Sequence, residues 1–401
     1  MIKRALFLVT LLGLTIGYSQ INNKMITNEL TNLYEKSDLV GFGVAILRKN
    51  EVVYSKGFGF SNKQKKTAYT TRTVQPIASI SKTFLAVALM KAQEQGKLNL
   101  DDDINIYLPF RIYNPNFKNE KITIRQLANH TSSIIDGDHY NDTYVFNKDI
   151  PSIYNDLKGD LKNEIKEFIE RANANEMMPL EDFIRKQYLK GDEYFSKDNF
   201  LTNKPGTKYK YSNMGANIAA LVLEKATGIE YKKFVKREIL QPLKMHNSGW
   251  PSKEFNPDTI SSLYWYGYLM PEGDLITYPD GNLMTNIEDF STYFLTIIKG
   301  YLGESNLLSA KDYKKMFHEP NSKKTKKAVF WNVDSEKIGH SGSDLGLLTH
   351  AYFFKESGDG IVVFVNTSDT KNGGLEVRDI YRTLLKHITN NKRKNENRFN
   401  K

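Results

Sequence analysis

The sequence predicts an α+β fold, in which an antiparallel sheet is built from both ends of the chain and flanked by helices. Apolar, β-branched runs occur near the N-terminus, at 40–47 and 51–60, and again at 347–354 and 360–365. Segments with helical spacing of apolar residues fill the middle of the chain. Strands at both ends with helices between them imply one sheet domain that carries an inserted, mostly helical subdomain.

The composition is that of an ordinary globular protein. The 401 residues are 40% hydrophobic and 25% charged, which allows a large core. The formal net charge is +10, and part of it lies in the lysine cluster 323–327 and the basic tail 391–401. We expect solvated loops and a disordered tail there, with no nucleic-acid partner and at most weak contact with anionic cell-wall or membrane surfaces.

The residue types available narrow the chemistry. The chain has no cysteine, which excludes disulfides, thiolate metal sites and cysteine nucleophiles. Its seven histidines have no H-E-x-x-H spacing, and the aspartates at 101–103 lack the alternation of an EF-hand loop. The sequence therefore predicts neither a metal nor another cofactor.

The N-terminus has the pattern of a secretory signal. Lys3 and Arg4 precede an apolar run over 5–16, and small residues follow at 17 and 19. We expect residues 1–19 to be a cleaved signal peptide of a secreted, periplasmic protein. An uncleaved anchor or a buried N-terminal helix remains the alternative.

The first part of the chain alternates helix and strand signals. An amphipathic helix is expected over 28–36, and the two N-terminal apolar runs form a β-hairpin around a tight turn at 48–50. A buried helix starts near Ser79 and ends at Gly96, because its residues are apolar nearly all round. A short capped helix follows within 122–132.

The middle of the chain forms the predicted helical subdomain, residues 101–244, between sheet-domain segments 20–100 and 245–390. Its extended insertion, 134–203, is polar and weakly patterned. We expect it either to lie over a functional site or to be an ordinary surface subdomain.

The remaining elements are helices bounded by glycine, proline or capping residues, and strands of high β-propensity. The expected helices are 161–172, 180–188, 214–226, 231–240, 287–298 (N-capped by Thr285 or Asn286) and 374–388, and a further strand covers 328–333.

Ser79 and Lys82 are three residues apart at the start of the buried helix, so they share one helix face. A serine hydroxyl needs a base to become a nucleophile, and burial is expected to lower the pKa of a lysine, which could then serve as that base. The helix N-terminus adds partial positive charge where an oxyanion would form. A capping serine beside a surface lysine is the alternative at this point.

Three motifs in order make the pattern more specific. Ser79-Ile80-Ser81-Lys82, Tyr211-Ser212-Asn213 and His340-Ser341-Gly342 resemble the motifs of serine β-lactamases and penicillin-recognising hydrolases. The resemblance is to the class C β-lactamase, D,D-carboxypeptidase and esterase superfamily, and it covers roughly residues 28–388. It implies a β-lactamase/transpeptidase-like fold.

The resemblance also implies roles. Ser79 would be the acylated nucleophile, and Lys82 and Tyr211 would share the general-base task, with the phenol kept partly ionised by the ammonium. Asn213 would hold Lys82 and touch the substrate amide. The oxyanion hole would be the backbone N–H groups of Ser79 and Ser343, and the strand lining the cleft would carry His340, Ser341 and Gly342.

One departure affects the expected substrate. His340 stands where β-lactamases of this type carry a lysine, and histidine is only partly charged near neutral pH. We therefore expect a serine hydrolase acting on an amide or ester, such as a D-amino-acid peptide, as D,D-carboxypeptidases and D-aminopeptidases do. A β-lactamase is the first alternative, and a catalytically inactive binding protein of the penicillin-binding type is the second.

Overall fold

The computed structural model describes residues 22–48, 51–146, 159–251, 255–317, 328–370 and 375–399. The predicted signal peptide (1–19), the turn residues Lys49 and Asn50, the lysine cluster 323–327 and residues 400–401 lie outside these ranges. Among the helices within them, none is long and apolar enough to cross a membrane.

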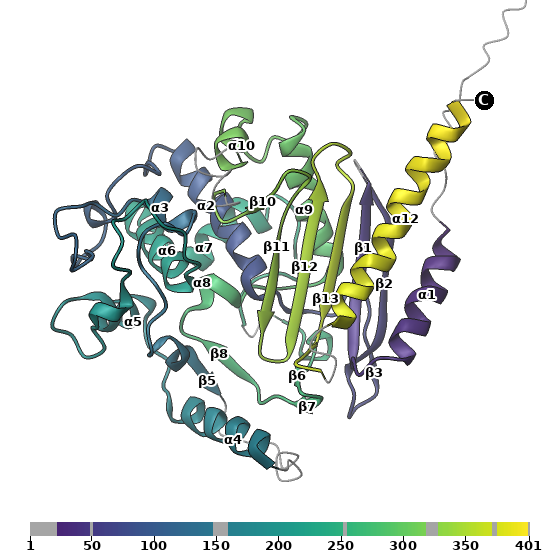
Figure 1. Cartoon of the computed structure of the whole chain (residues 1–401), viewed down its shortest axis with the longest axis horizontal. Helices are drawn as coiled ribbons and strands as arrows, with labels where there is room; N and C mark the ends of the chain where they lie inside the picture. The colour runs from purple at the N-terminus through teal and green to yellow at the C-terminus, as the bar shows by residue number, and fades with distance from the viewer. Residues whose placement is uncertain are drawn as a thin grey trace, which may run out of the picture.

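A seven-stranded antiparallel sheet forms the centre of the molecule, in the order β10-β11-β12-β13-β1-β2-β3 (Figure 1). The N-terminal hairpin pairs directly with the C-terminal strands, with Phe42 opposite Val365 and Leu47 opposite Gly360. The predicted α+β sheet built from both termini is confirmed. Its strands are β1 (Gly41–Arg48), β2 (Glu51–Asn62), β3 (Thr67–Ala68), β10 (Asn332–Val333), β11 (Lys337–Asp344), β12 (Leu347–Phe354) and β13 (Gly360–Val365).

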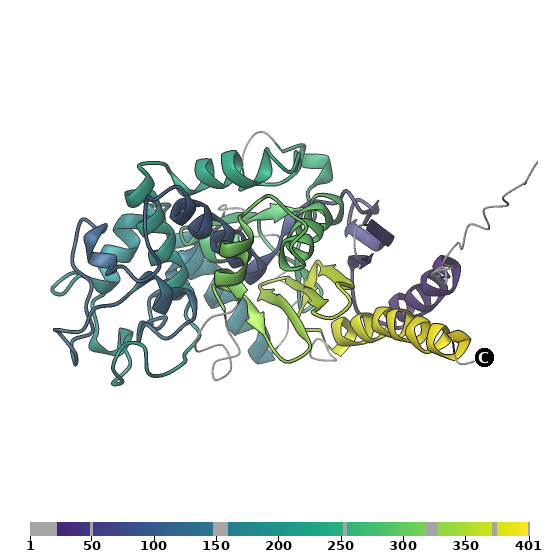
Figure 2. The ribbon, with the colours of Figure 1, turned by 90° about the horizontal axis from the view of Figure 1, so that it is seen from above.

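Both faces of the sheet are covered because its central strands are apolar on both sides. On β1, Phe42, Val44 and Ile46 pack in one cluster with the terminal helices, and Ala45 and Leu47 belong to the main core on the opposite face. Figures 1 and 2 show the terminal helices side by side on one face. The helices against the sheet are α1 (Asn23–Glu35), α12 (Leu375–Phe399), α2 (Ser81–Glu94), α9 (Ile287–Tyr301) and α10 (Ala310–Phe317).

The two terminal helices are also joined by charge. Glu29 on α1 accepts from Lys386 at 3.1 Å and lies 3.0 Å from Nε2 of His387 on α12. Helix α12 continues to Phe399, beyond the expected end at 388 and through most of the segment predicted to be a disordered tail. The physical reason is that residues 389–399 contain neither glycine nor proline to end the helix.

The helical part packs beside the sheet around the buried helix α2. Helix α6 starts at its N-cap Ser212, whose side chain accepts from the backbone of Gly215, and ends at Gly228, which has the left-handed φ of 71°. The helices of this part are α3 (Ile124–Ala128), α5 (Leu180–Tyr188), α6 (Asn213–Thr227), α7 (Tyr231–Val235) with a π-helical continuation (Lys236–Leu240), and α8 (Tyr278–Gly281).

The insertion 134–203 leaves the helical part and returns to it. Its turn η3 (Tyr140–Thr143) leads into β5 (Tyr144–Phe146), which pairs with β8 (Gly273–Leu275). Helix α4 (Gly159–Ala174) then packs Phe168 against Trp265, with ring centroids 5.9 Å apart. The remaining short strands are β4 (Gln75–Pro76), β6 (Tyr264–Trp265), β7 (Tyr268–Leu269), β9 (Met284–Thr285) and β14 (Thr367–Ser368).

Candidate active site

Ser79 lies in a short 3₁₀ turn, Ala78–Ile80, immediately before helix α2. Neighbouring segments fix this turn: the backbone N–H of Ile77 donates to Leu283 at 3.0 Å, and the hydroxyl of Thr349 donates to the Ile77 carbonyl at 2.9 Å. Ala78 adopts a left-handed φ of 45°, which is strained for a residue with a Cβ. The serine therefore sits on a constrained turn at the N-terminus of a buried helix.

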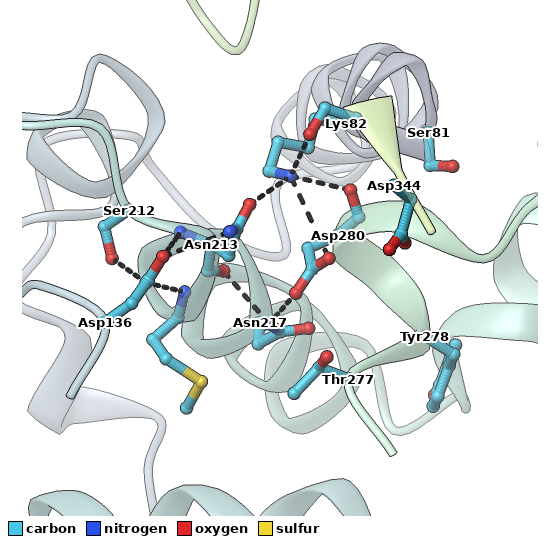
Figure 3. Close-up of polar contacts among 12 residues, drawn as sticks. Ser81, Lys82, Asp136, Ser212, Asn213, Asn217, Thr277, Tyr278, Asp280 and Asp344 are labelled. Carbon is cyan, nitrogen blue, oxygen red and sulfur yellow. Dashed lines mark hydrogen bonds and ion pairs between the residues drawn. The ribbon is translucent and has the colours of Figure 1, made fainter. Parts of the chain in front are cut away.

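Lys82 points back toward Ser79 and is fully buried. Its Nζ donates to Oγ of Ser79 at 3.1 Å, to Oδ1 of Asn213 at 2.8 Å and to the backbone carbonyl of Asp280 at 2.6 Å (Figure 3). An ammonium group has three N–H donors, and each of these acceptors takes one. The site is thus built to hold the lysine side chain in one orientation.

The electrostatic surroundings of Lys82 differ from the sequence-based expectation. Burial by itself lowers the pKa of Lys82, but the neighbouring Tyr211 and the carboxylates of Asp280 and Asp136 outweigh it, and the net direction is upward. The expectation that burial makes this lysine give up its proton easily is therefore wrong.

Tyr211 completes the contacts of the serine. Its hydroxyl lies 2.8 Å from Oγ of Ser79, and its ring centroid is 5.3 Å from the Lys82 amine. The ring packs against His130, with centroids 4.4 Å apart, and Nδ1 of His130 accepts from the backbone of Ser212 at 3.2 Å. The structure therefore brings Ser79, Lys82 and Tyr211 into one hydrogen-bonded group, with His130 as a support that the sequence did not suggest.

Asn213 is held by a carboxylate that the sequence analysis missed. Asp136, from the start of the insertion, accepts from the Asn213 side chain at 3.0 Å and from the backbone N–H groups of Asn213 and Met214 at 3.1 and 2.8 Å. It also accepts from the Ser212 hydroxyl at 3.0 Å. A carboxylate is favourable at a helix N-terminus, so Asp136 both caps α6 and orients Asn213 toward Lys82.

The third predicted motif lies on β11, along the side of the site. A cleft of about 770 Å³ is lined by Ser79, Tyr211 and Asn213, by residues 340–343 of this strand, and by residues of β12 and α12. Both residues expected to supply oxyanion-hole N–H groups, Ser79 and Ser343, line it. Seven of the eight predicted site residues thus line one cleft, and the eighth, Lys82, is buried behind Ser79 and contacts it.

His340 is buried at the inner end of this motif and faces Tyr211, with ring centroids 6.5 Å apart. Its Nδ1 lies 2.7 Å from the Ser341 carbonyl oxygen. Because a carbonyl oxygen only accepts, Nδ1 is the donor in this contact. Within the described residues, no group of three or more His, Asp or Glu side chains could hold a metal ion.

Gly342 is the point at which β11 touches the turn that carries the serine. A Cβ placed there would lie 2.7 Å from the Ile77 carbonyl oxygen and 2.8 Å from Cβ of Ala78. We expect Gly342→Ala to push the strand away from Ser79 and to reduce the rate of acylation by roughly 100-fold, since small displacements of reacting groups are costly.

Labelling kinetics with a fluorophosphonate probe measure this effect. Gly215→Ala is the matched control: a Cβ there makes only ordinary contacts, the shortest at 3.5 Å, and alanine favours a helix interior. Equal labelling rates for wild type and Gly342→Ala would contradict the assigned contact.

Residues 26–385, which are nearly the whole chain, match the family model named Beta-lactamase. This chain belongs to the Beta-lactamase family. Members of the family are generally hydrolases, although some are inactive. The family membership and the three motifs agree, since each motif contributes residues to the lining of the cleft.

Sequence relatives within the Beta-lactamase family are distant. Protein flp of Staphylococcus aureus is 27% identical over 362 residues, which cover 88% of this chain and 64% of that protein. Penicillin-binding protein 4* of Bacillus subtilis is 27% identical over 219 residues, 55% of this chain and 40% of that protein. The chain spans less than two thirds of the length of these relatives.

Solved structures show the same fold. A penicillin-binding protein homologue from Pyrococcus abyssi superposes with a TM-score of 0.67 and 23% identity, covering 86% of this chain and 74% of that chain. The D-amino acid amidase of Ochrobactrum anthropi SV3 gives 0.66 and 18%, covering 92% and 99%. The β-lactamase/transpeptidase-like fold expected from the resemblance is confirmed.

Proposed function

We propose that this chain is a serine hydrolase that forms an acyl-enzyme through Ser79 on an amide or ester. The observation that carries the proposal is the double contact of the Ser79 hydroxyl, at 3.1 Å from the Lys82 amine and 2.8 Å from the Tyr211 oxygen. A nucleophilic serine needs such a base within hydrogen-bond reach and a cation to balance the developing charge.

The reaction then runs in two steps. In the reacting form Tyr211 carries no proton, and its oxygen takes the proton of Ser79 as Oγ bonds to the carbonyl carbon. The oxyanion is received by the backbone N–H groups of Ser79 and Ser343. The C–N or C–O bond breaks as the leaving group takes that proton, and water later hydrolyses the acyl ester. Lys82 remains an ammonium ion and stabilises the negative charge nearby.

The substrate we propose is a D-amino-acid peptide, amide or ester. Support comes from the D-amino acid amidase and from the β-lactamase/D-alanine carboxypeptidase of Yersinia pestis among the structural neighbours. A further support is the residue type at position 340, because a lysine there, as β-lactamases of this type carry, would hold a β-lactam carboxylate more firmly than a histidine does. A β-lactamase is the second candidate, since the family model carries that name.

Substrate competition separates the two candidates. We expect release of D-alanine from a D-Ala-D-Ala peptide, or of ammonia from D-alanine amide, with nitrocefin hydrolysed much more slowly. Both rates are measured with the same preparation, and kcat/KM values are compared. Faster turnover of nitrocefin would reverse the order and make the chain a β-lactamase.

We also propose secretion to the periplasm, on the pattern of residues 1–19. Mass spectrometry of the N-terminus after export tests it, and we expect a mature chain that begins near Gln20.

The alternative from another functional class is a catalytically inactive binding protein. Absence of any covalent adduct with fluorescent penicillin and with a fluorophosphonate probe would favour that rival.

A further inference from the structure

Asp280 lies directly behind Lys82, and no motif of the sequence had pointed to it. Helix α8 carries it, and only 3% of the residue is exposed. Its backbone carbonyl accepts from Lys82 at 2.6 Å, and its carboxylate Oδ1 lies 4.0 Å from the same nitrogen (Figure 3). One residue therefore holds the amine by two different groups, of which only the second is charged.

Two neutral side chains fix the carboxylate of Asp280. The amide of Asn217, on α6, donates to Oδ2 at 2.5 Å, and the hydroxyl of Tyr140, on η3 of the insertion, lies 3.1 Å from the same oxygen. These contacts orient the carboxylate without neutralising it. The negative charge of the carboxylate is instead balanced by the Lys82 amine, which lies within ion-pair distance.

The titratable groups around the carboxylate come from five segments of the chain, while α6 contributes the neutral Asn217. They are Lys82 from α2, Asp136 from the segment before η3, Tyr140 from η3, Tyr144 from β5 and Asp344 from the end of β11. Burial raises the pKa of Asp280 to about 6, and the nearby carboxylates of Asp136 and Asp344 act in the same direction. The ammonium of Lys82 and the amide of Asn217 oppose this rise.

We propose that Asp280 is a positioning residue whose negative charge, held against Lys82, sets the pH range in which Ser79 is acylated. The inference rests on the proposed function, because it needs acylation of Ser79. A fixed negative charge makes each proton of the neighbouring group harder to remove. Because Lys82 and Tyr211 lie in one hydrogen-bonded cluster, that charge moves the titration of the whole cluster to higher pH.

The direct test is Asp280→Asn, which removes the charge and keeps both the shape of the side chain and the backbone carbonyl. The second-order rate of labelling by a fluorophosphonate probe is measured from pH 5 to pH 10. Above about pH 6, where Asp280 of the wild type is charged, the bell-shaped profile of the variant is expected to lie at lower pH by about one to two units, the shift that one opposite charge at this distance produces. The variant then labels faster than wild type between pH 6 and the wild-type optimum, and more slowly at the alkaline end.

The two profiles should also converge at low pH. Below about pH 6, Asp280 of the wild type carries a proton and has the same charge as asparagine. Wild type and Asp280→Asn then label at similar rates. A merely structural role would lower the rate of the variant at every pH without moving the profile, and that result would overturn the inference.

A second variant keeps the test valid if Asp280→Asn fails to fold. Tyr140→Phe removes one hydrogen-bond donor from the carboxylate at a partly exposed position. The carboxylate then binds its proton more tightly, and the acidic change in the wild-type profile, near pH 6, is expected to move to higher pH. An unchanged profile for this variant would count against the inference.

A control variant and the labelling of the wild type distinguish failure of the Asp280 role from failure of the proposed function. Asp274→Asn changes a partly buried aspartate that also accepts from an amide, at 2.5 Å from Asn282, and should leave the profile unchanged. If wild type is not labelled at Ser79 at all, the proposed function fails and the inference fails with it. If wild type is labelled and Asp280→Asn has the wild-type profile, only the role of Asp280 is wrong.

Discussion

Replacing Ser79 by alanine is expected to abolish covalent labelling and to reduce turnover by roughly 10⁴-fold or more. The hydroxyl is the group that Lys82 and Tyr211 both contact, at 3.1 and 2.8 Å, so its removal leaves these two side chains without a nucleophile to activate. Intact-protein mass spectrometry after exposure to a fluorescent penicillin, and kcat/KM on D-alanine amide, measure the two effects.

Ser81 provides the matched control for this experiment. It is the next serine of the same motif, but its Oγ accepts from the backbone of Leu283 at 3.2 Å and points away from the Lys82 amine (Figure 3). Ser81→Ala should therefore keep its labelling. An adduct that survives Ser79→Ala and disappears in Ser81→Ala would show that the nucleophile has been assigned to the wrong serine.

Replacing Tyr211 by phenylalanine is expected to lower kcat/KM by about 10²- to 10⁴-fold, the usual contribution of a general base. The aromatic ring, which packs on His130, is retained, so the fold should be as stable as that of the wild type. The loss would then come from the oxygen 2.8 Å from Ser79. Steady-state kinetics and a thermal unfolding curve are measured together.

Tyr209 is a suitable comparison, because it also faces His130, edge-on with centroids 6.2 Å apart, and is 38% exposed. Tyr209→Phe should keep kcat/KM close to the wild-type value. If Tyr211→Phe also kept it, the proton of Ser79 would have to go elsewhere, and the assignment of Tyr211 would be refuted.

The sheet could be predicted from the sequence wherever a strand is a run of residues with high β-propensity. The bounds expected for β12 and β13 are those observed: β13 is a continuous buried β-branched run, and β12 alternates buried and partly exposed residues. The strand expected over 328–333 reduces to Asn332–Val333, since Phe330 adopts a left-handed φ of 53° and breaks the extended run. Hydrophobicity alone carries no signal for such a local turn.

The site could be predicted in part because its residues lie in spaced motifs. Ser79, Lys82, Tyr211 and Asn213 meet as expected. Asp280 was missed because Tyr-Pro-Asp-Gly has the composition of an exposed turn, whereas tertiary packing buries it.

Asp136 and His130 were missed for a different reason. Their contacts with the 212–214 segment join residues about 80 positions apart in the sequence, and neither is marked by spacing. The direction of the Lys82 pKa shift was wrongly predicted for the same reason, because it depends on carboxylates that only the fold brings close to the lysine.

The pairing of β1 with β13 has a consequence for how this chain is made. Residues 41–48 must remain without that partner until residues 360–365 have been synthesised, so the central ladder closes late and over a very long sequence separation. A product that stops before Gly360 would expose the apolar edge of β1 as a template for intermolecular pairing. Premature termination should therefore yield aggregates rather than a smaller active enzyme.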